Sequence, residues 1–387
     1  MIPAKYNIRN LRVRWVTTLM TVIGTGLVVW TTVLTFGLSD GVEHALRVSG
    51  HALDLIVLRK GSSDETGSIL DQQTAREIAT LEGIATNKNG QPLCSIEYAT
   101  ILTKPRRGNG GTTNLIVRGL EEVGRELRPD FKIVRGRDVR PGVNEAITSE
   151  QMAKRFENLA IGERLEINQV DFQIVGYFEA GGSAAESEVW TVLGDLTGAR
   201  RQAGTASSVN LRAIDPSSKD ALLTRIQEDQ QFNLKAIEET EYFEEQMTAA
   251  IAIKFFAYVL AIFLTFGAMF AAANTMYAAV ASRGREIGTL RALGFRRRSI
   301  LISFLFESVV LCLMGGLLGC LATLPLNGLS GGTANWATFS EITFSFRFGP
   351  GVLLRGVLMA LAMGLLGGLF PAVRATRMNI VDALREH

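Results

Sequence analysis

Four long apolar runs constrain this chain more than any other feature. They cover Trp15–Leu38, Phe255–Ser282, the stretch between Arg298 and Leu329, and Gly351–Val373. The first two runs contain no charged residue, whereas the third contains Glu307 and the fourth contains Arg355. Because a bilayer core about 30 Å thick needs about 20 helical residues, each run is long enough to span it. The sequence therefore predicts an integral membrane protein with four transmembrane helices.

The basic residues beside these runs predict their orientation. Three flanks are rich in them, namely the N-terminal flank (Lys5, Arg9, Arg12, Arg14), the loop after the second run (Arg283, Arg285, Arg291, Arg296, Arg297, Arg298) and the C-terminal tail (Arg374, Arg377, Arg385). The loop between the third and fourth runs has only Arg347. Basic residues near the ends of spans stay in the cytoplasm. We therefore expect a multi-pass membrane protein with both termini cytoplasmic.

The segment between the first and second runs is then extracytoplasmic. Residues 39–248 contain 33 acidic and 24 basic residues, a net charge of −9, although the whole chain has a net charge of +2. The basic residues elsewhere sit at the ends of spans and set topology, so they do not indicate nucleic-acid binding. A segment of this length is large enough for a hydrophobic core of its own.

Alternating patterns in this segment predict an α+β domain. We expect helices over 39–49, 71–81, 217–227 and 239–254, and strands over 53–58, 95–102, 114–118, 208–214 and 233–237. The early and late pieces are expected to share one sheet, and residues 130–206 are expected to form a mostly β insert. The predicted fold is an α-helical membrane protein with four transmembrane helices and an α+β extracytoplasmic domain inserted between the first two. Three domains are expected. Residues 1–38 form the cytoplasmic N-terminus and first transmembrane helix, residues 39–248 form the extracytoplasmic domain with its stalk helices, and residues 249–387 form three transmembrane helices with the cytoplasmic loop 283–298 and the cytoplasmic tail.

No catalytic site is legible in the sequence. The chain contains no G-x-x-x-x-G-K-[ST] phosphate-binding loop. Its three histidines, His44, His51 and His387, do not have the spacing of metal ligands. We therefore expect no catalytic residue, no cofactor and no metal in this chain.

Two features of the membrane segments suggest interactions. Glu307 is costly within a span, on the order of 3 kcal/mol at a helix centre. It is explained by a hydrogen bond to another span or chain, by a role in a conformational switch, or by an ion pathway. Glycine pairs with GxxxG spacing occur in the third and fourth runs, at Gly315, Gly319, Gly364 and Gly368. Small residues let helices approach closely, either within one chain or between the chains of a dimer.

The loop after the second run has the pattern of a short amphipathic helix. Ile287, Leu290 and Leu293 recur at helical spacing, and Gly294 follows them. Topology-setting charge on a helix that lies at the membrane surface explains this pattern, and so does a helix that seats in a partner protein.

Three stretches of sequence identify a family. The stretch FKIVRGRDV…NEAITSEQMAKRF…IGERLEINQVDFQIVGYF is similar to the extracytoplasmic core domain of MacB/FtsX-type (type VII) permeases of ABC transporters. The stretch SRGREIGTLRALGFRRRSILISFLFESVVLCLMGGLLG resembles that family's second cytoplasmic loop and third span. The ending GGLFPAVRATRMNIVDALR resembles its last span and tail.

The resemblance implies a non-catalytic permease subunit. ATP and Mg²⁺ would bind to a separate ABC ATPase, whose hydrolysis would drive extracytoplasmic movement, a mechanism called mechanotransmission, to export or extract a lipid, lipoprotein or peptide. It also implies a location in the bacterial cytoplasmic (inner) membrane, a homodimer or a paired permease, and an extracytoplasmic adaptor as a further partner. The ATPase-coupling residues would be Arg283, Arg285, Glu286, Ile287, Thr289, Leu290, Arg291, Leu293 and Gly294. The alternatives are a signalling subunit that regulates an extracytoplasmic cell-wall enzyme, or a membrane-anchored scaffold without an ATPase.

Overall fold

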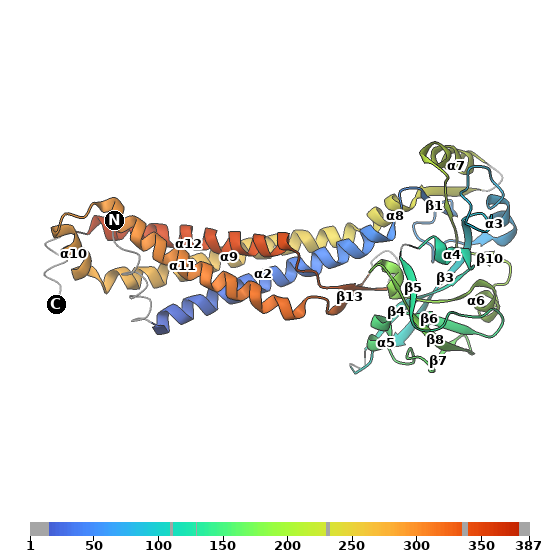
Figure 1. The fold of residues 1–387 in the computed structure, drawn as a ribbon, viewed down its shortest axis with the longest axis horizontal. Coiled ribbons are helices and arrows are strands. Elements are labelled where there is room, and N and C mark those ends of the chain that lie inside the picture. The colour runs from blue at the N-terminus through green and yellow to red at the C-terminus, as the bar shows by residue number, and fades with distance from the viewer. Residues whose placement is uncertain (1–14, 109–110, 129, 230–232, 335–339, 379–387) are drawn as a thin grey trace. The chain divides into compact units, whose positions relative to one another are not determined.

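The computed structural model describes residues 15–108, 111–128, 130–229, 233–334 and 340–378 (Figure 1). The N-terminal basic flank at 1–14 and Arg385 of the C-terminal flank lie outside these residues, whereas Arg374 and Arg377 lie within them. The chain divides into two compact units. The helical unit comprises residues 1–40, 252–329 and 346–387, and the globular unit comprises residues 41–251 and 330–345.

Four long helices have the length and composition to cross a membrane, as the sequence predicted. They are α2 (Trp15–Ser49), α9 (Thr248–Ala281), α11 (Arg297–Thr323) and α12 (Pro350–Arg377). A short helix, α10 (Gly284–Ala292), connects α9 to α11, and the 3₁₀ turn η2 (Leu324–Leu326) follows α11. Most large apolar side chains of α9 are exposed, which suits a helix that faces lipid.

The globular unit is built on one mixed sheet (Figure 1). Its strands are β1 (Asp54–Arg59), β3 (Cys94–Pro105), β4 (Thr112–Leu120), β5 (Phe131–Gly136), β6 (Glu145–Thr148), β7 (Arg164–Ile167), β8 (Val170–Ala180), β9 (Glu188–Val192), β11 (Ser208–Arg212) and β12 (Leu234–Glu238). Their order is β12-β1-β11-β3-β4-β9-β6-β8-β5, with β7 paired to β8. The early strand β1 lies between the late strands β11 and β12, so the prediction that both pieces share one sheet is confirmed.

Short helices and two smaller ladders complete the globular unit. They are α3 (Gln72–Ile78), α4 (Val123–Glu126), α5 (Glu150–Arg155), η1 (Ala184–Ser187), α6 (Leu193–Ala199), α7 (Pro216–Glu228) and α8 (Glu239–Gln246), with β2 (Leu70–Asp71) paired to β10 (Thr205–Ala206). Helices α3 and α7 begin where Asp71 and Asp215 accept hydrogen bonds from the first-turn amides, the usual role of an aspartate N-cap. The parallel pair β4/β9 joins the expected insert to the same sheet.

A hairpin from the segment between α11 and α12 also belongs to the globular unit. Strands β13 (Ser330–Ala334) and β14 (Glu341–Ser345) pair antiparallel. The buried carboxylate of Glu341 forms ion pairs with Arg106 and Arg155, and the Thr343 amide donates to Ser187 Oγ at 2.8 Å. The sequence analysis placed all of 249–387 with the membrane part. It missed this hairpin because the partners of Glu341 lie about two hundred residues earlier in the chain.

The polar face of the central sheet holds a buried ion cluster around Arg118. The guanidinium contacts Glu65 at 2.7 Å, Glu188 at 2.7 Å and Glu97 at 2.8 Å. Arg128 contacts the same oxygen of Glu97 at 2.7 Å. Burial alone would raise the pKa of Glu65, but Arg118 lowers it to about 2. The cluster therefore keeps Glu65 ionised in the interior, where an unpaired charge would be costly.

Glu239 lies beside this cluster at the start of α8. Its carboxylate accepts a hydrogen bond from the His51 amide at 2.9 Å. Burial raises the pKa of Glu239 to about 8, with Asp54 and Glu97 adding to the increase and Arg128 opposing it. A buried carboxyl group with a raised pKa favours the folded state only while it keeps its proton.

We expect stability to fall as pH rises because of Glu239. An ordinary glutamate pKa of 4.5 rises to about 8 on folding, so the contribution is full below pH 4.5 and is lost as pH approaches 8. Replacing Glu239 with Gln should flatten this decline in melting temperature, measured on the full chain in detergent. Glu241→Gln, an exposed neighbour on the same helix, is the control and should keep the wild-type profile. Identical pH profiles for wild type and Glu239→Gln would show that the carboxyl group does not titrate in this range.

Candidate functional site: helix α10 and its anchors

Helix α10 is short and bounded by specific local features. It follows Arg283 directly and ends before Gly294, whose φ of +88° is a left-handed conformation that favours glycine. The Gly294 amide donates to the Arg291 carbonyl and the Phe295 amide to the Leu290 carbonyl, which satisfies carbonyls at the end of the helix. The predicted helix in this loop is therefore present and has a defined C-terminus.

A buried ion pair connects the start of α10 to α11. Arg283 Nη1 lies 2.7 Å from Glu307 Oε2, and both side chains are less than a tenth exposed. The same guanidinium lies over the Phe304 ring, 5.7 Å from its centroid. Of the explanations considered for Glu307, the structure provides the polar contact within the chain. Arg283 accordingly faces the interior, although the sequence analysis expected it on the coupling surface.

Two further contacts connect α10 to its neighbours. Ile287 is buried in an apolar cluster with Met276 of α9, Ile300 of α11 and Ala375 of α12. Arg291 Nη1 donates to the Thr376 carbonyl at 2.9 Å, which satisfies a carbonyl in the last turn of α12. These contacts join α10 to α9, α11 and α12, so the short helix is seated on the bundle through three kinds of interaction.

The remaining residues of the predicted coupling set are divided by exposure. Arg285, Glu286, Thr289, Leu293 and Gly294 are exposed, and Leu293 is 72% exposed. Leu290 and Arg291 are half-buried, whereas Arg283 and Ile287 are buried. The apolar stripe that the sequence showed therefore splits, with Ile287 packed into the bundle and Leu293 directed away from its core.

The four glycines of the predicted packing set all contact other helices of the same chain. A Cβ at Gly315 or Gly319 would collide with backbone or side-chain atoms of α2 around Gly26, and one at Gly364 or Gly368 would collide with α11 around Ser308. Ser308 Oγ also donates to the Gly364 carbonyl at 2.9 Å. Of the two explanations for these glycines, packing within the chain accounts for their positions.

Sequence reasoning missed the partners of these residues rather than the residues themselves. Gly26 on α2, Phe304 on α11 and Thr376 on α12 were not singled out, because each looks ordinary in its own stretch of sequence. The small residue Gly26 within an apolar run was the one available signal. The buried cluster around Arg118 gave no signal at all, since its members are scattered from Glu65 to Glu188.

Comparison with known proteins supports this arrangement of a permease. The MacB-like periplasmic core domain family matches residues 15–229, and the FtsX-like permease C-terminal family matches residues 258–380. The fold and its anchored loop helix thus define a permease-type membrane protein. The chain belongs to the MacB-like family of ABC transporter permeases.

Several curated proteins are similar to this chain. The macrolide export ATP-binding/permease protein MacB of Bdellovibrio bacteriovorus is 26% identical over 94% of this chain and 58% of its own length. The protein of the same name from Brucella melitensis is 27% identical over 98% of this chain and 60% of its own length. The uncharacterized ABC transporter permease YvrN of Bacillus subtilis is 36% identical over 29% of this chain and 25% of its own length. The chain therefore spans less than two thirds of the MacB relatives.

The periplasmic region of MacB from Actinobacillus actinomycetemcomitans aligns with 54% of this chain and 98% of its own, at 10% identity and a TM-score of 0.37.

We expect the Arg283–Glu307 pair to stabilise the helical unit as a pair. Arg283→Met should leave Glu307 buried without its partner and lower stability, by about 3–5 kcal/mol. The double variant Arg283→Met with Glu307→Met should recover most of this loss, because well-packed apolar residues often replace a buried pair without penalty. Melting temperature in detergent provides the measurement.

The exposed Arg285→Met is the matched control and should change little. The single variant Glu307→Met completes the set. If the double variant loses as much stability as Arg283→Met and Glu307→Met lose together, the two side chains act independently.

Proposed function

We propose that this chain is the permease part of an ABC transporter, in which an ATP-binding partner docks on α10 and its movements are passed to the globular unit. One observation carries the proposal, namely that α10 is anchored on the bundle by Arg283, Ile287 and Arg291 while its other face is exposed. A helix held in this way follows a force applied to its free face instead of swinging separately. Family membership supports the same assignment.

The exposed face has the chemistry of a protein contact. Leu293 is 72% exposed and is accompanied by Arg285, Glu286 and Thr289. A large apolar side chain among polar ones matches the usual composition of an interface, where apolar anchors are surrounded by polar groups. We propose that Leu293 enters an apolar groove on the partner, and that the partner binds ATP and Mg²⁺, because this sequence contains no phosphate-binding loop.

The movement would act on a cargo outside the cytoplasm. We propose that two permease chains act together, with the globular units extracytoplasmic and both termini cytoplasmic, to export or extract a lipid, lipoprotein or peptide. An extracytoplasmic adaptor protein would complete such an assembly. Two curated relatives are named for macrolide export and combine ATP-binding and permease parts, and this supports coupling to ATP for the present chain.

Replacing Leu293 with Asp should weaken docking of the ATP-binding partner. The charge would have to be desolvated in an apolar groove, which costs on the order of a few kcal/mol. We expect copurification of the partner and stimulation of its ATPase activity to fall sharply, while melting temperature stays unchanged because Leu293 is exposed. Leu290→Asp should lower both partner docking and melting temperature, since that side chain is half-buried.

Glu157→Lys is the matched control for this experiment, because it changes an exposed charge in the globular unit. Glu341→Lys is unsuitable as a control, since Glu341 is buried between two arginines. Normal docking by Leu293→Asp together with loss of docking by Glu157→Lys would place the partner on the globular unit and refute the proposal.

The proposed orientation predicts the accessibility of single cysteines. The native residues Cys94, Cys312 and Cys320 are all buried, so we expect them to react little with the labelling reagent. In intact spheroplasts, a cysteine replacing the exposed Glu150 should react with an impermeant maleimide, whereas one replacing the exposed Arg285 should react only after permeabilisation. The reverse pattern would invert the topology and move α10 away from any cytoplasmic ATPase.

A further inference from the structure

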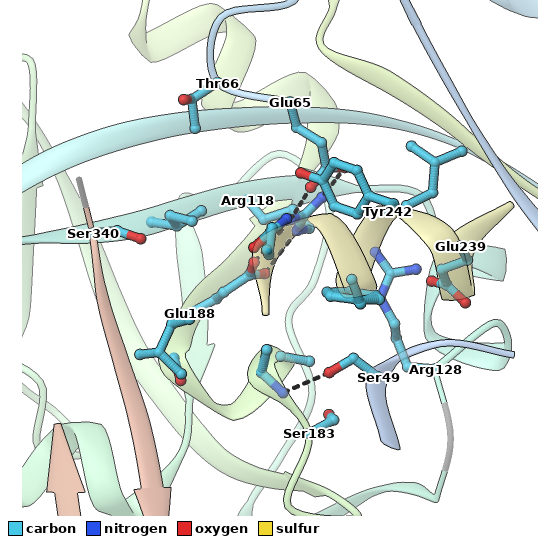
Figure 2. A pocket seen from close by; sticks show the side chains of 18 of the residues that line it. Ser49, Glu65, Thr66, Arg118, Arg128, Ser183, Glu188, Glu239, Tyr242 and Ser340 are labelled. Atoms are coloured by element: carbon cyan, nitrogen blue, oxygen red, sulfur yellow. Dashed lines mark hydrogen bonds and ion pairs between the residues drawn. The ribbon is translucent and has the colours of Figure 1, made fainter. Parts of the chain in front are cut away.

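A cavity with a mixed polar and apolar lining lies in the globular unit, at the Arg118 cluster (Figure 2). Its volume is about 60 Å³, several times the space of about 10–15 Å³ that one water molecule needs. Its lining includes the polar residues Arg118, Arg128, Glu239 and Asn210, together with Tyr242, Phe243 and Ile342. The cavity therefore has room for a group of a few heavy atoms, in contact with both polar and apolar residues.

Asn210 is the notable residue of this cavity. It is 4% exposed, and neither its side-chain oxygen nor its side-chain nitrogen has a hydrogen-bond partner. It lies on β11 between Ser208, which donates to Glu65, and Arg212, which pairs with Asp54. Buried amides without partners are rare because desolvation without a hydrogen bond is costly. The neighbours on its strand are satisfied, so the unpaired amide points to a ligand.

The other unpaired groups of the cavity are consistent with a ligand that accepts hydrogen bonds. Arg128 Nη1 and Ser183 Oγ also line the cavity and have no partner. Figure 2 shows Arg128 beside Glu239 and Ser183 close to Ser49. A ligand with a carbonyl oxygen and an N–H group would therefore find both donors and an acceptor here.

The charges around the cavity favour a ligand without net charge. Arg118 and Arg128 are matched by Glu65, Glu97 and Glu188, so an added anion would meet an excess of carboxylates. An added cation would instead lie against two buried guanidinium groups. Either charge would also lose its hydration on entry. A neutral polar group avoids both costs.

We propose that this cavity is a binding site for a primary carboxamide, which pairs with the Asn210 amide through two hydrogen bonds. A primary carboxamide carries an N–H on the same side as its oxygen, so one group donates to Asn210 Oδ1 while accepting from Nδ2. A trans peptide group has its N–H and oxygen on opposite sides and cannot form this pair. Arg128 Nη1 supplies a further donor to the ligand oxygen. The carboxamide belongs to a small molecule or to an asparagine or glutamine side chain.

Four probes of nearly the same size test this assignment. Saturation-transfer NMR on the full chain in deuterated detergent would compare acetamide with acetate, acetamidinium and N-methylacetamide. Acetamide should bind, whereas the two charged analogues and the secondary amide should bind at least about tenfold more weakly, the loss expected when two hydrogen bonds fail. Equal binding of acetate, acetamidinium or N-methylacetamide would overturn the proposal.

Variants of Asn210 test whether acetamide binds in this cavity. Asn210→Leu should abolish acetamide binding while keeping the melting temperature, because it removes an unpaired buried amide. Asn210→Ser serves the same purpose if the leucine does not fit. Asn89→Leu, an exposed position, is the control and should bind as wild type does. Binding that survives both Asn210 changes, or no acetamide binding by wild type, would show that the cavity holds only water.

Competition distinguishes the two sources of the carboxamide. A capped glutamine that displaces acetamide, when the matching capped glutamate does not, supports a side chain of a bound polypeptide. Binding of acetamide without displacement by the capped glutamine supports a small-molecule ligand of the same class.

Discussion

The globular unit depends on Arg118 more than on any other side chain. This residue lies on β4, at the point where the strands of residues 54–120 meet the strands of the later insert. Its contacts reach Glu97 on β3, Glu188 on β9 and the loop residue Glu65. Three carboxylates in one interior would repel one another, and five hydrogen bonds from one guanidinium hold them together. The cluster thus specifies how the two parts of the sheet pair, which apolar contacts alone would leave less well defined.

The helical unit relies less on buried ion pairs than the globular unit does. One buried pair, Arg283 with Glu307, fixes the short helix α10, and close glycine contacts bring the long helices together. This difference follows from the surroundings, because lipid gives helices little hydrophobic reason to associate. Small residues and a few polar contacts then provide most of the specificity. A functional loop helix can be mobile in a membrane protein, but α10 is tied to its neighbours at both ends.

The sequence was sufficient for the features that a strong local pattern marks. The four spans follow from continuous apolar runs, and the strands of the sheet follow from alternation, so their type and approximate bounds were predictable. The helix in the loop after α9 was predictable for the same reason. Its exposure pattern was not, because Arg283 and Ile287 are turned inward by Glu307 and by an apolar cluster that draws on three other helices.

Long-range polar pairs lay beyond the reach of a single sequence. Glu341 was assigned with the rest of 249–387 to the membrane part, yet its partners Arg106 and Arg155 bury it within the globular unit. Nothing in the segment Glu341–Ser345 distinguishes a strand that pairs with its hairpin partner from a short stretch of loop. The hairpin gives the globular unit two more covalent connections to the helical unit, one at each end of residues 330–345, in addition to α2 and the α8–α9 segment. The hairpin lies between α11 and α12 in the chain, so a force that reaches either helix has a covalent route into the globular unit. The two ion pairs of Glu341 hold the hairpin to that unit. The hairpin is therefore a link between the two units in addition to the long helices.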